Sequence, residues 1–189
     1  MWNYQIVFLL LKITEQISLK LYKYVGAKEI KLSVANYPIG TQIKSQTDIK
    51  RWVDKTRQKP NKFGYIEATF IIDKTGYLRI ADRHSEHIAC SGGNPVLSAG
   101  EILFFLNKNQ YEIAEISNQS TGFCPEPISW FWVSQALDKI PINHPGGFTI
   151  EFEFRRCTKC GQLNVIKGDW FVCDVCEAYL SPSWNCDLE

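Results

Sequence analysis

Four cysteines near the C-terminal end constrain the fold of this chain more strongly than any other feature. They form two pairs, Cys157 with Cys160 and Cys173 with Cys176, and two residues lie between the members of each pair. This spacing allows a tight turn to direct both sulfur atoms at one ion, and zinc takes four such ligands in a closed tetrahedral site. Two disulfides or a redox-active pair are the alternatives. Disulfides are disfavoured because the sequence shows no convincing secretory signal, and redox pairs usually open a helix, which neither pair does here.

The residues between the two pairs predict a short hairpin. Leu163–Ile166 and residues 170–172 are rich in apolar side chains and flank a turn at 167–169. Gly161 follows the first pair, at a position where such turns commonly need a positive φ. This stretch resembles the zinc-ribbon superfamily across residues 154–180. Because cysteine fills all four ligand positions, we expect one structural Zn²⁺ with no open position for water or substrate.

Length and charge divide the chain into three expected regions. Its 189 residues, 45% of them hydrophobic, can build one substantial core and a small module. Residues 1–62 carry twelve Lys and Arg against four Asp and Glu, residues 63–150 carry five against nine, and residues 151–189 carry four against seven. With these boundaries we expect a helical, basic N-terminal region, a β-rich central domain and the zinc ribbon. A nucleic acid would contact the N-terminal region, although a solvated lysine-rich face explains the same charges.

Two helices are predicted in the N-terminal region. Residues 1–25 place apolar side chains at helical spacing, and their apolar run is too short to span a bilayer. Three roles remain open for this helix: a core or dimer element, a membrane-surface helix, or a contact for a partner chain. Residues 30–44 predict a short strand and a loop, and Thr47 can cap a second helix that ends near Gln58. The basic residues on or beside this second helix form the most credible anion-contacting surface. They are Lys50, Arg51, Lys55, Arg57, Lys59 and Lys62.

The rest of the chain before the cysteines has the pattern of strands joined by turns, with one helix at 129–139. The expected strands are 65–73, 77–81, 101–106, 111–117 and 148–154. The last strand runs into the first cysteine pair without a linker. The sequence therefore predicts an α+β fold, in which a mainly antiparallel β domain carries two or three helices and a C-terminal zinc ribbon packs against it.

Polar and glycine-rich loops between the strands hold the candidate catalytic residues. Loops that are presented by rigid strands are where sites are usually built. A nucleophilic site would use Cys90 or Cys124 as the thiolate, a histidine as the base, and Glu101 or Asn118 to orient that base. The candidate histidines are His84, His87 and His144.

Three other interpretations of the same loops stay open. The first is recognition of a polar or phosphorylated ligand by backbone amides and small polar side chains. The residues concerned are Gly92, Gly93, Asn118, Gln119, Ser120 and Thr121. The second is a further metal site at His84, His87 and Cys90, although residues three apart on a strand point to opposite faces. The third is that all these residues only form turns and strand ends.

Residues 80–140 also match a recurring order of short motifs. The matching positions are His84, Ser85, Gly92, Gly93, Val96, Ala99, Gly100, Glu101, Asn118, Ser120, Gly122 and Pro125. In this order and spacing the stretch resembles a module of plant IQ-motif-containing calmodulin-binding proteins and of some bacterial toxin-type proteins. The chain departs from that pattern at Glu86, where the module has a second serine, and at 121–124, where the histidine of the module is lost. The resemblance implies a β-rich scaffold with a pocket built from loops.

These observations lead to one functional hypothesis and two alternatives. We expect a cytoplasmic zinc-ribbon protein, without a transmembrane segment, that binds a protein partner or a small polar ligand through the central loops. The first alternative is an enzyme, either a hydrolase or a transferase, that uses the histidine, cysteine and glutamate side chains of those loops. The second alternative is nucleic-acid binding through the basic N-terminal region.

Overall fold

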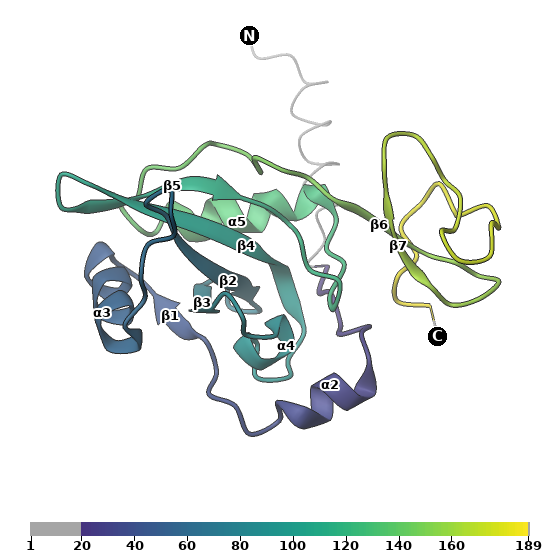
Figure 1. The fold of residues 1–189 in the computed structure, drawn as a ribbon, viewed down its shortest axis with the longest axis horizontal. Coiled ribbons are helices and arrows are strands. Elements are labelled where there is room, and N and C mark those ends of the chain that lie inside the picture. The colour runs from purple at the N-terminus through teal and green to yellow at the C-terminus, as the bar shows by residue number, and fades with distance from the viewer. Residues whose placement is uncertain (1–19, 189) are drawn as a thin grey trace, which may run out of the picture.

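The computed structural model describes residues 20–188 and confirms the α+β fold. Its larger sheet has five antiparallel strands in the order β1-β3-β2-β4-β5, and a two-stranded sheet, β6-β7, lies beside the cysteine loops (Figure 1). The strands are β1 (Thr41–Ile43), β2 (Ile66–Asp73), β3 (Leu78–Asp82), β4 (Val96–Asn107), β5 (Gln110–Ile116), β6 (Glu153–Arg156) and β7 (Leu163–Ile166). The α-helices of the described part are α2 (Lys28–Ser33), α3 (Gln46–Thr56), α4 (His87–Cys90) and α5 (Trp130–Leu137), and a 3-10 helix, η1 (Pro127–Ser129), precedes α5.

Strand β2 lies inside the larger sheet and is buried on both faces. Phe70 belongs to a core cluster that also holds side chains of α3 and α5. Ile71, the next residue, belongs to a second cluster with Ile88 of α4 and Phe123. Because successive side chains of a strand point to opposite faces, the apolar run at 70–72 fits a part of β2 that is covered on both sides.

The predicted helix at 1–25 lies mostly outside the described residues, and its last part is not helical. Residues 20–25 run in an extended form. The backbone N–H of Tyr22 donates to the carbonyl of Val96 over 2.8 Å, and the N–H of Val96 donates back over 3.0 Å. Helical spacing alone could not reveal this pairing, because Val96 is distant in the sequence. Helix α2, which the sequence pattern did not indicate, overlaps the first part of the expected strand and loop at 30–44, and β1 is the short strand in that range.

Helix α3 confirms the second predicted helix, but Ser45 caps it and not Thr47. The Ser45 hydroxyl accepts a hydrogen bond from the backbone N–H of Asp48, and the Asp48 carboxylate accepts one from the backbone N–H of Lys44. This reciprocal arrangement satisfies amides that have no partner inside the helix. The helix ends at Thr56, and the C-cap residue Arg57 has a left-handed conformation with φ 55°.

Strand β4 begins at Val96, five residues before the predicted start at 101. Residues 96–100 pair with the far end of β2, so Gly100 lies opposite Phe70 within the sheet. The expected strand at 148–154 is shorter than predicted, because regular pairing starts only at Glu153. In the cysteine region, β7 pairs with β6, whereas residues 170–172 form only isolated bridges in place of the second arm of a hairpin.

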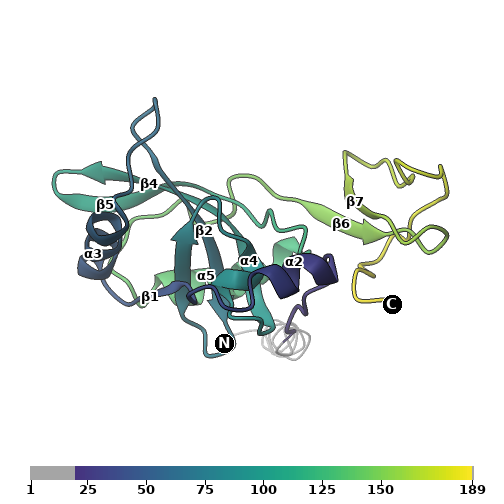
Figure 2. The same cartoon turned by 60° about the horizontal axis from the view of Figure 1, so that its bottom comes forward.

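The C-terminal region that holds the four cysteines packs against the rest of the chain, as the sequence predicted. The indole N–H of Trp184 donates to the carbonyl of Cys124 over 2.7 Å. The Asn118 side chain donates to the carbonyls of Pro125 and Phe152 and accepts from the backbone N–H of Phe152, each over 2.8 Å. Figure 2 shows the cysteine loops projecting at the end of the molecule opposite α3. No helix in residues 20–188 is long and apolar enough to cross a membrane.

Candidate metal centre and ligand pocket

The four sulfur atoms of Cys157, Cys160, Cys173 and Cys176 lie within 4.8 Å of one another. The Sγ atoms of Cys157 and Cys176 are 3.5 Å apart, and those of Cys160 and Cys173 are 3.6 Å apart. In a tetrahedral site with metal–sulfur bonds of about 2.3 Å, neighbouring sulfur atoms are about 3.8 Å apart. The four side chains therefore already have the arrangement that a closed four-sulfur metal site requires.

Both cysteine pairs sit on the same kind of turn. In the first turn, the backbone N–H of Gly161 donates to the carbonyl of Cys157 over 2.8 Å, and Gly161 has φ 78°. In the second, the N–H of Glu177 donates to the carbonyl of Cys173 over 3.0 Å, and Glu177 has φ 58°. The positive φ predicted for Gly161 is confirmed. The second turn imposes the same conformation on a residue with a side chain, which is unfavourable for any residue but glycine.

Backbone amides favour the thiolate form at one cysteine of each pair. Hydrogen bonds from the N–H groups of Cys160 and Lys159 lower the pKa of Cys157. Burial alone would raise the pKa of Cys173, but the N–H groups of Cys176 and Val175 outweigh it and lower that pKa to about 6. Because the thiolate is the form that binds metal, the turns favour the ligand form at Cys157 and Cys173.

A pocket of about 220 Å³ lies on one face of the larger sheet, where β2, β4 and β5 meet the loops that follow β3 and β5. We call it the Glu101 pocket. The polar and charged residues that line it include Glu67, Arg83, Glu101, Glu115, Ser117 and Gln119. Arg83 forms an ion pair with Glu67, and the Asn61 amide also donates to Glu67 over 2.6 Å. Glu101 and Glu115 have no ion pair with Lys or Arg among the described residues.

Glu101 is the residue of this pocket with the most altered acidity. Its side chain is 32% exposed. Burial raises its pKa to about 7, although the positive charge of Arg83 and a hydrogen bond from Thr69 act in the opposite direction. A carboxyl group of this acidity exchanges a proton near neutral pH.

His87 lies next to Glu101 as a neutral side chain. Burial lowers its pKa to about 4. Its Nε2 is 3.0 Å from the carbonyl oxygen of Gly100 and 3.5 Å from Glu101 Oε1. Because the Gly100 carbonyl can only accept, Nε2 carries the proton and donates it, so this nitrogen is not free to act as a base.

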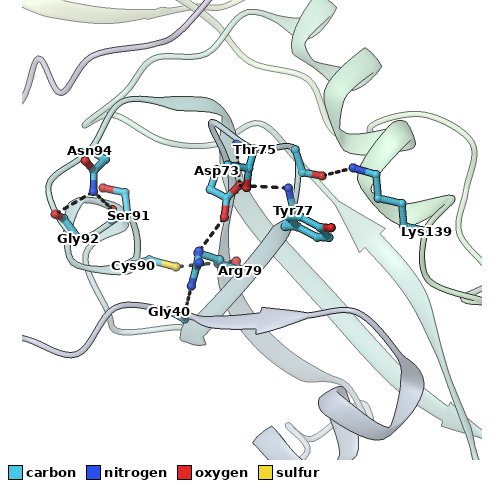
Figure 3. A network of polar contacts seen from close by, with 11 residues as sticks. Gly40, Asp73, Thr75, Tyr77, Arg79, Cys90, Ser91, Gly92, Asn94 and Lys139 are labelled. Carbon is cyan, nitrogen blue, oxygen red and sulfur yellow. Dashed lines mark hydrogen bonds and ion pairs between the residues drawn. The ribbon is translucent and has the colours of Figure 1, made fainter.

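The cysteines proposed as nucleophiles are buried and remain thiols. Burial raises the pKa of Cys90 to about 12, and its Sγ points at the carbonyl of Arg79, 3.8 Å away (Figure 3). The thiol of Cys186 and burial raise the pKa of Cys124. Neither cysteine lines the Glu101 pocket. The geometry therefore gives no support to a cysteine nucleophile, and Cys186 serves as a packing residue beside Cys124.

The remaining candidate histidines lie outside the Glu101 pocket. His84 is exposed, and its backbone N–H donates to Asp82. His144 packs beside the Trp130 ring and accepts a hydrogen bond from the N–H of Gly146. Neither contact brings these histidines together with a cysteine, so the four-cysteine cluster is the candidate metal site among the described residues.

Most of the residues proposed for ligand recognition serve the protein itself. The amides of Gly92 and Gly93 donate to the carbonyls of Ala89 and Ile88 at the end of α4, so these N–H groups are not open to a ligand. Figure 3 shows Gly92 next to Asn94, and the side-chain amide of Asn94 donates a hydrogen bond to the carbonyl of Gly92. The hydrogen bonds of Asn118 are all internal, as described above. The Ser120 hydroxyl is buried without a hydrogen-bond partner among the described residues, and Thr121 is exposed.

Gln119 and Glu101 are the predicted residues that line the pocket, and sequence reasoning missed Glu67, Arg83 and Glu115. Strand register could have found two of them. Glu101 pairs with Thr69, and Leu103 pairs with both Glu67 and Glu115. Paired residues of neighbouring strands share a face, so the alternation of polar positions places these carboxyl groups together.

The basic residues around α3 are all exposed, and Arg51 forms an ion pair with Asp48.

Comparison of the chain with protein-family models, with curated proteins and with solved structures finds no match.

Proposed function

We propose that this chain is a zinc-ribbon protein that binds a small polar ligand in the Glu101 pocket. Zinc is supported by the chemistry of the donor set, since four cysteines at tetrahedral spacing with no open position are typical of structural zinc. The observation that carries the ligand proposal is a pocket whose wall holds a carboxyl group with a pKa of about 7. Concave sites with a few converging polar groups and altered acidity are where ligands bind.

The charges of the pocket favour a ligand with several hydrogen-bond donors, such as an amine or a polyol. Glu67 is already paired with Arg83, so Glu101, Glu115 and the Gln119 amide are the groups left to accept hydrogen bonds from a ligand. The apolar side chains of Leu103 and Ile150 can cover the less polar part of such a molecule. A second candidate function is general acid–base catalysis by Glu101, because a pKa near the working pH suits a group that both gives and takes a proton.

We expect Glu101→Gln to raise the stability of the protein relative to the wild type more at pH 8 than at pH 5. The folded-state pKa of Glu101 is raised above the ordinary value of 4.5. The protonated form therefore supports folding at low pH, and this support is lost as the pH rises through about 7. Glutamine stays neutral at both pH values. The free energy of unfolding of the variant, relative to that of the wild type, should therefore rise by about 1–2 kcal/mol from pH 5 to pH 8, which allows for the exposure of Glu101 to solvent. Urea unfolding at pH 5 and pH 8 measures this change, and a difference that is the same at both pH values would contradict the proposed acidity.

A binding experiment tests the function itself. Zinc-loaded protein is screened by NMR against small amines, amides and polyols, and the shifts of backbone amides near Glu101, Glu115 and Gln119 are followed. We expect ligands that shift these signals to bind more tightly as the pH rises through 7, because a donor-rich ligand prefers the ionised carboxylate. Glu101→Gln should remove that pH dependence. Ligands that map to another surface, or whose binding is unchanged in the variant, would overturn the proposal, and conversion of a bound compound would favour the catalytic alternative.

A further inference from the structure

A second cavity, of about 370 Å³, lies between the N-terminal segment, α2, the end of β6 and the C-terminal tail. Figures 1 and 2 both show α2 on the side of the molecule that faces the C-terminal end. Among residues 20–188, four cationic side chains line this cavity, namely those of Lys23, Lys28, Lys31 and Arg156, against one carboxylate, Asp187. The cavity shares no lining residue with the Glu101 pocket. It is therefore a separate site with the opposite charge.

Hydrogen bonds fix the orientation of Arg156, and its charge has no acidic partner among the described residues. Its guanidinium donates to the carbonyls of Cys186 over 3.1 Å, Gly161 over 3.0 Å and Val25 over 3.3 Å. These bonds use three of the five N–H donors of an arginine and fix its orientation. No carboxylate of residues 20–188 lies within ion-pair distance of Arg156, whereas the adjacent Arg155 pairs with Glu153 over 2.9 Å. Neutral carbonyls do not cancel the charge, so Arg156 can still receive an anion.

The three lysines add charge that is likewise unpaired within the described part of the chain. Four cations against one carboxylate match a ligand with more than one negative charge. A single carboxylate is too weakly charged, and a phosphate monoester carries about −1.5 to −2 at neutral pH. Two linked phosphates match the excess of positive charge in the cavity better than one phosphate does. Arginine binds pairs of phosphate oxygens through its planar fork, and lysines act as point charges around them.

The size and the remaining wall of the cavity fit a small molecule. Its volume lies in the range of small-molecule sites. The ring of Tyr24 and the side chain of Leu188 supply an apolar surface for the part of the ligand that is not phosphate. The basic residues around α3 lie at the opposite end of the molecule, so the cations do not form one continuous track for a polymer (Figure 1). We propose that this cavity binds a small molecule that carries a diphosphate group, with Arg156 fixed on one phosphate and the lysines around both.

Titration calorimetry of zinc-loaded protein with inorganic pyrophosphate and with ADP tests this site. Inorganic phosphate and a short oligothymidylate are the comparison ligands. We expect pyrophosphate and ADP to bind more tightly than phosphate, and the double variant Lys28→Gln with Lys31→Gln to weaken both about tenfold. These lysines are exposed and belong to a short surface helix, so the variant should fold. Tighter binding of ADP than of pyrophosphate would show that the apolar wall takes part.

The matched control is Lys50→Gln with Lys55→Gln, which removes two exposed charges from α3. Its affinity for pyrophosphate should equal that of the wild type. Arg156→Lys is a further variant, which keeps the charge but loses the fork and should also weaken binding, provided its thermal unfolding is unchanged. The proposal is overturned if pyrophosphate does not bind, if both lysine pairs weaken binding equally, or if the oligonucleotide binds more tightly than pyrophosphate and ADP.

Discussion

Replacing both Cys157 and Cys160 with serine is expected to release the zinc and unfold the ribbon region. Two of four thiolate ligands are lost, and the remaining pair cannot close a tetrahedral site. The apolar cluster around the cysteines holds Leu180 as its one buried side chain apart from Cys157 and Cys173. So small a core cannot fold by hydrophobic burial alone. With zinc bound as proposed, the metal would supply the folding free energy of this region, on the order of 10 kcal/mol in comparable small zinc modules.

The measurement combines native mass spectrometry with NMR of the double variant. We expect no bound zinc. The amide signals of residues after β6 should lose their chemical-shift dispersion, whereas those of the five-stranded sheet should stay unchanged. Cys186→Ala is the matched control. Cys186 is buried beside Cys124 but belongs to no metal cluster, so this variant should keep its zinc despite some loss of packing. Unchanged zinc content and unchanged thermal unfolding in the double variant would contradict the structural role of the metal.

Gly100→Ala is expected to destabilise the protein by more than about 3 kcal/mol. A Cβ atom at Gly100 would lie 1.8 Å from the carbonyl oxygen of Ser117, and this neighbour is backbone and not a side chain that could rotate away. To avoid this clash, β4 would have to move away from the segment that follows β5. That movement would also disturb the hydrogen bond from His87 to the Gly100 carbonyl and the position of Glu101 in the pocket.

Urea unfolding of Gly100→Ala and of Gly147→Ala gives the comparison. Apart from its chain neighbours, no atom of the described residues lies within 4 Å of a Cβ at Gly147, and its backbone does not need positive φ, so this control should change the free energy of unfolding by less than about 0.5 kcal/mol. Equal stability of the two variants would show that β4 and the Ser117 backbone do not approach each other as closely as described.

Local patterns in the sequence were enough to predict the features that depend on neighbouring residues. The two cysteine turns, the hairpin of β2 and β3, and the hairpin of β4 and β5 each join residues close in the chain, so spacing, alternation and turn residues identify them. Helix α5 was found for the same reason. The early start of β4 was missed because the small residues 98–100 look like a loop until β2 is placed beside them.

The site was predicted only in part because its geometry is not local. Glu101 and Gln119 were among the candidates, but Glu67 and Glu115 join them only through the register of three strands. The roles of His87 and Cys90 depend on burial, which shifts their acidity away from catalysis and cannot be read from residue types. Asn118 has the appearance of a ligand-binding side chain in a loop, yet it ties the loop to the strand that enters the ribbon.

The zinc content of the purified chain tests the central claim most directly. Native mass spectrometry, supported by elemental analysis, counts the metal ions in each folded molecule. One zinc per chain, released when the four cysteines of the C-terminal cluster are modified, is the expected result. A chain that folds with no metal, or that holds its four cysteines as disulfides, would contradict the claim. A second zinc that remains after those cysteines are modified would show a metal site outside the cysteine cluster and contradict the expected count of one.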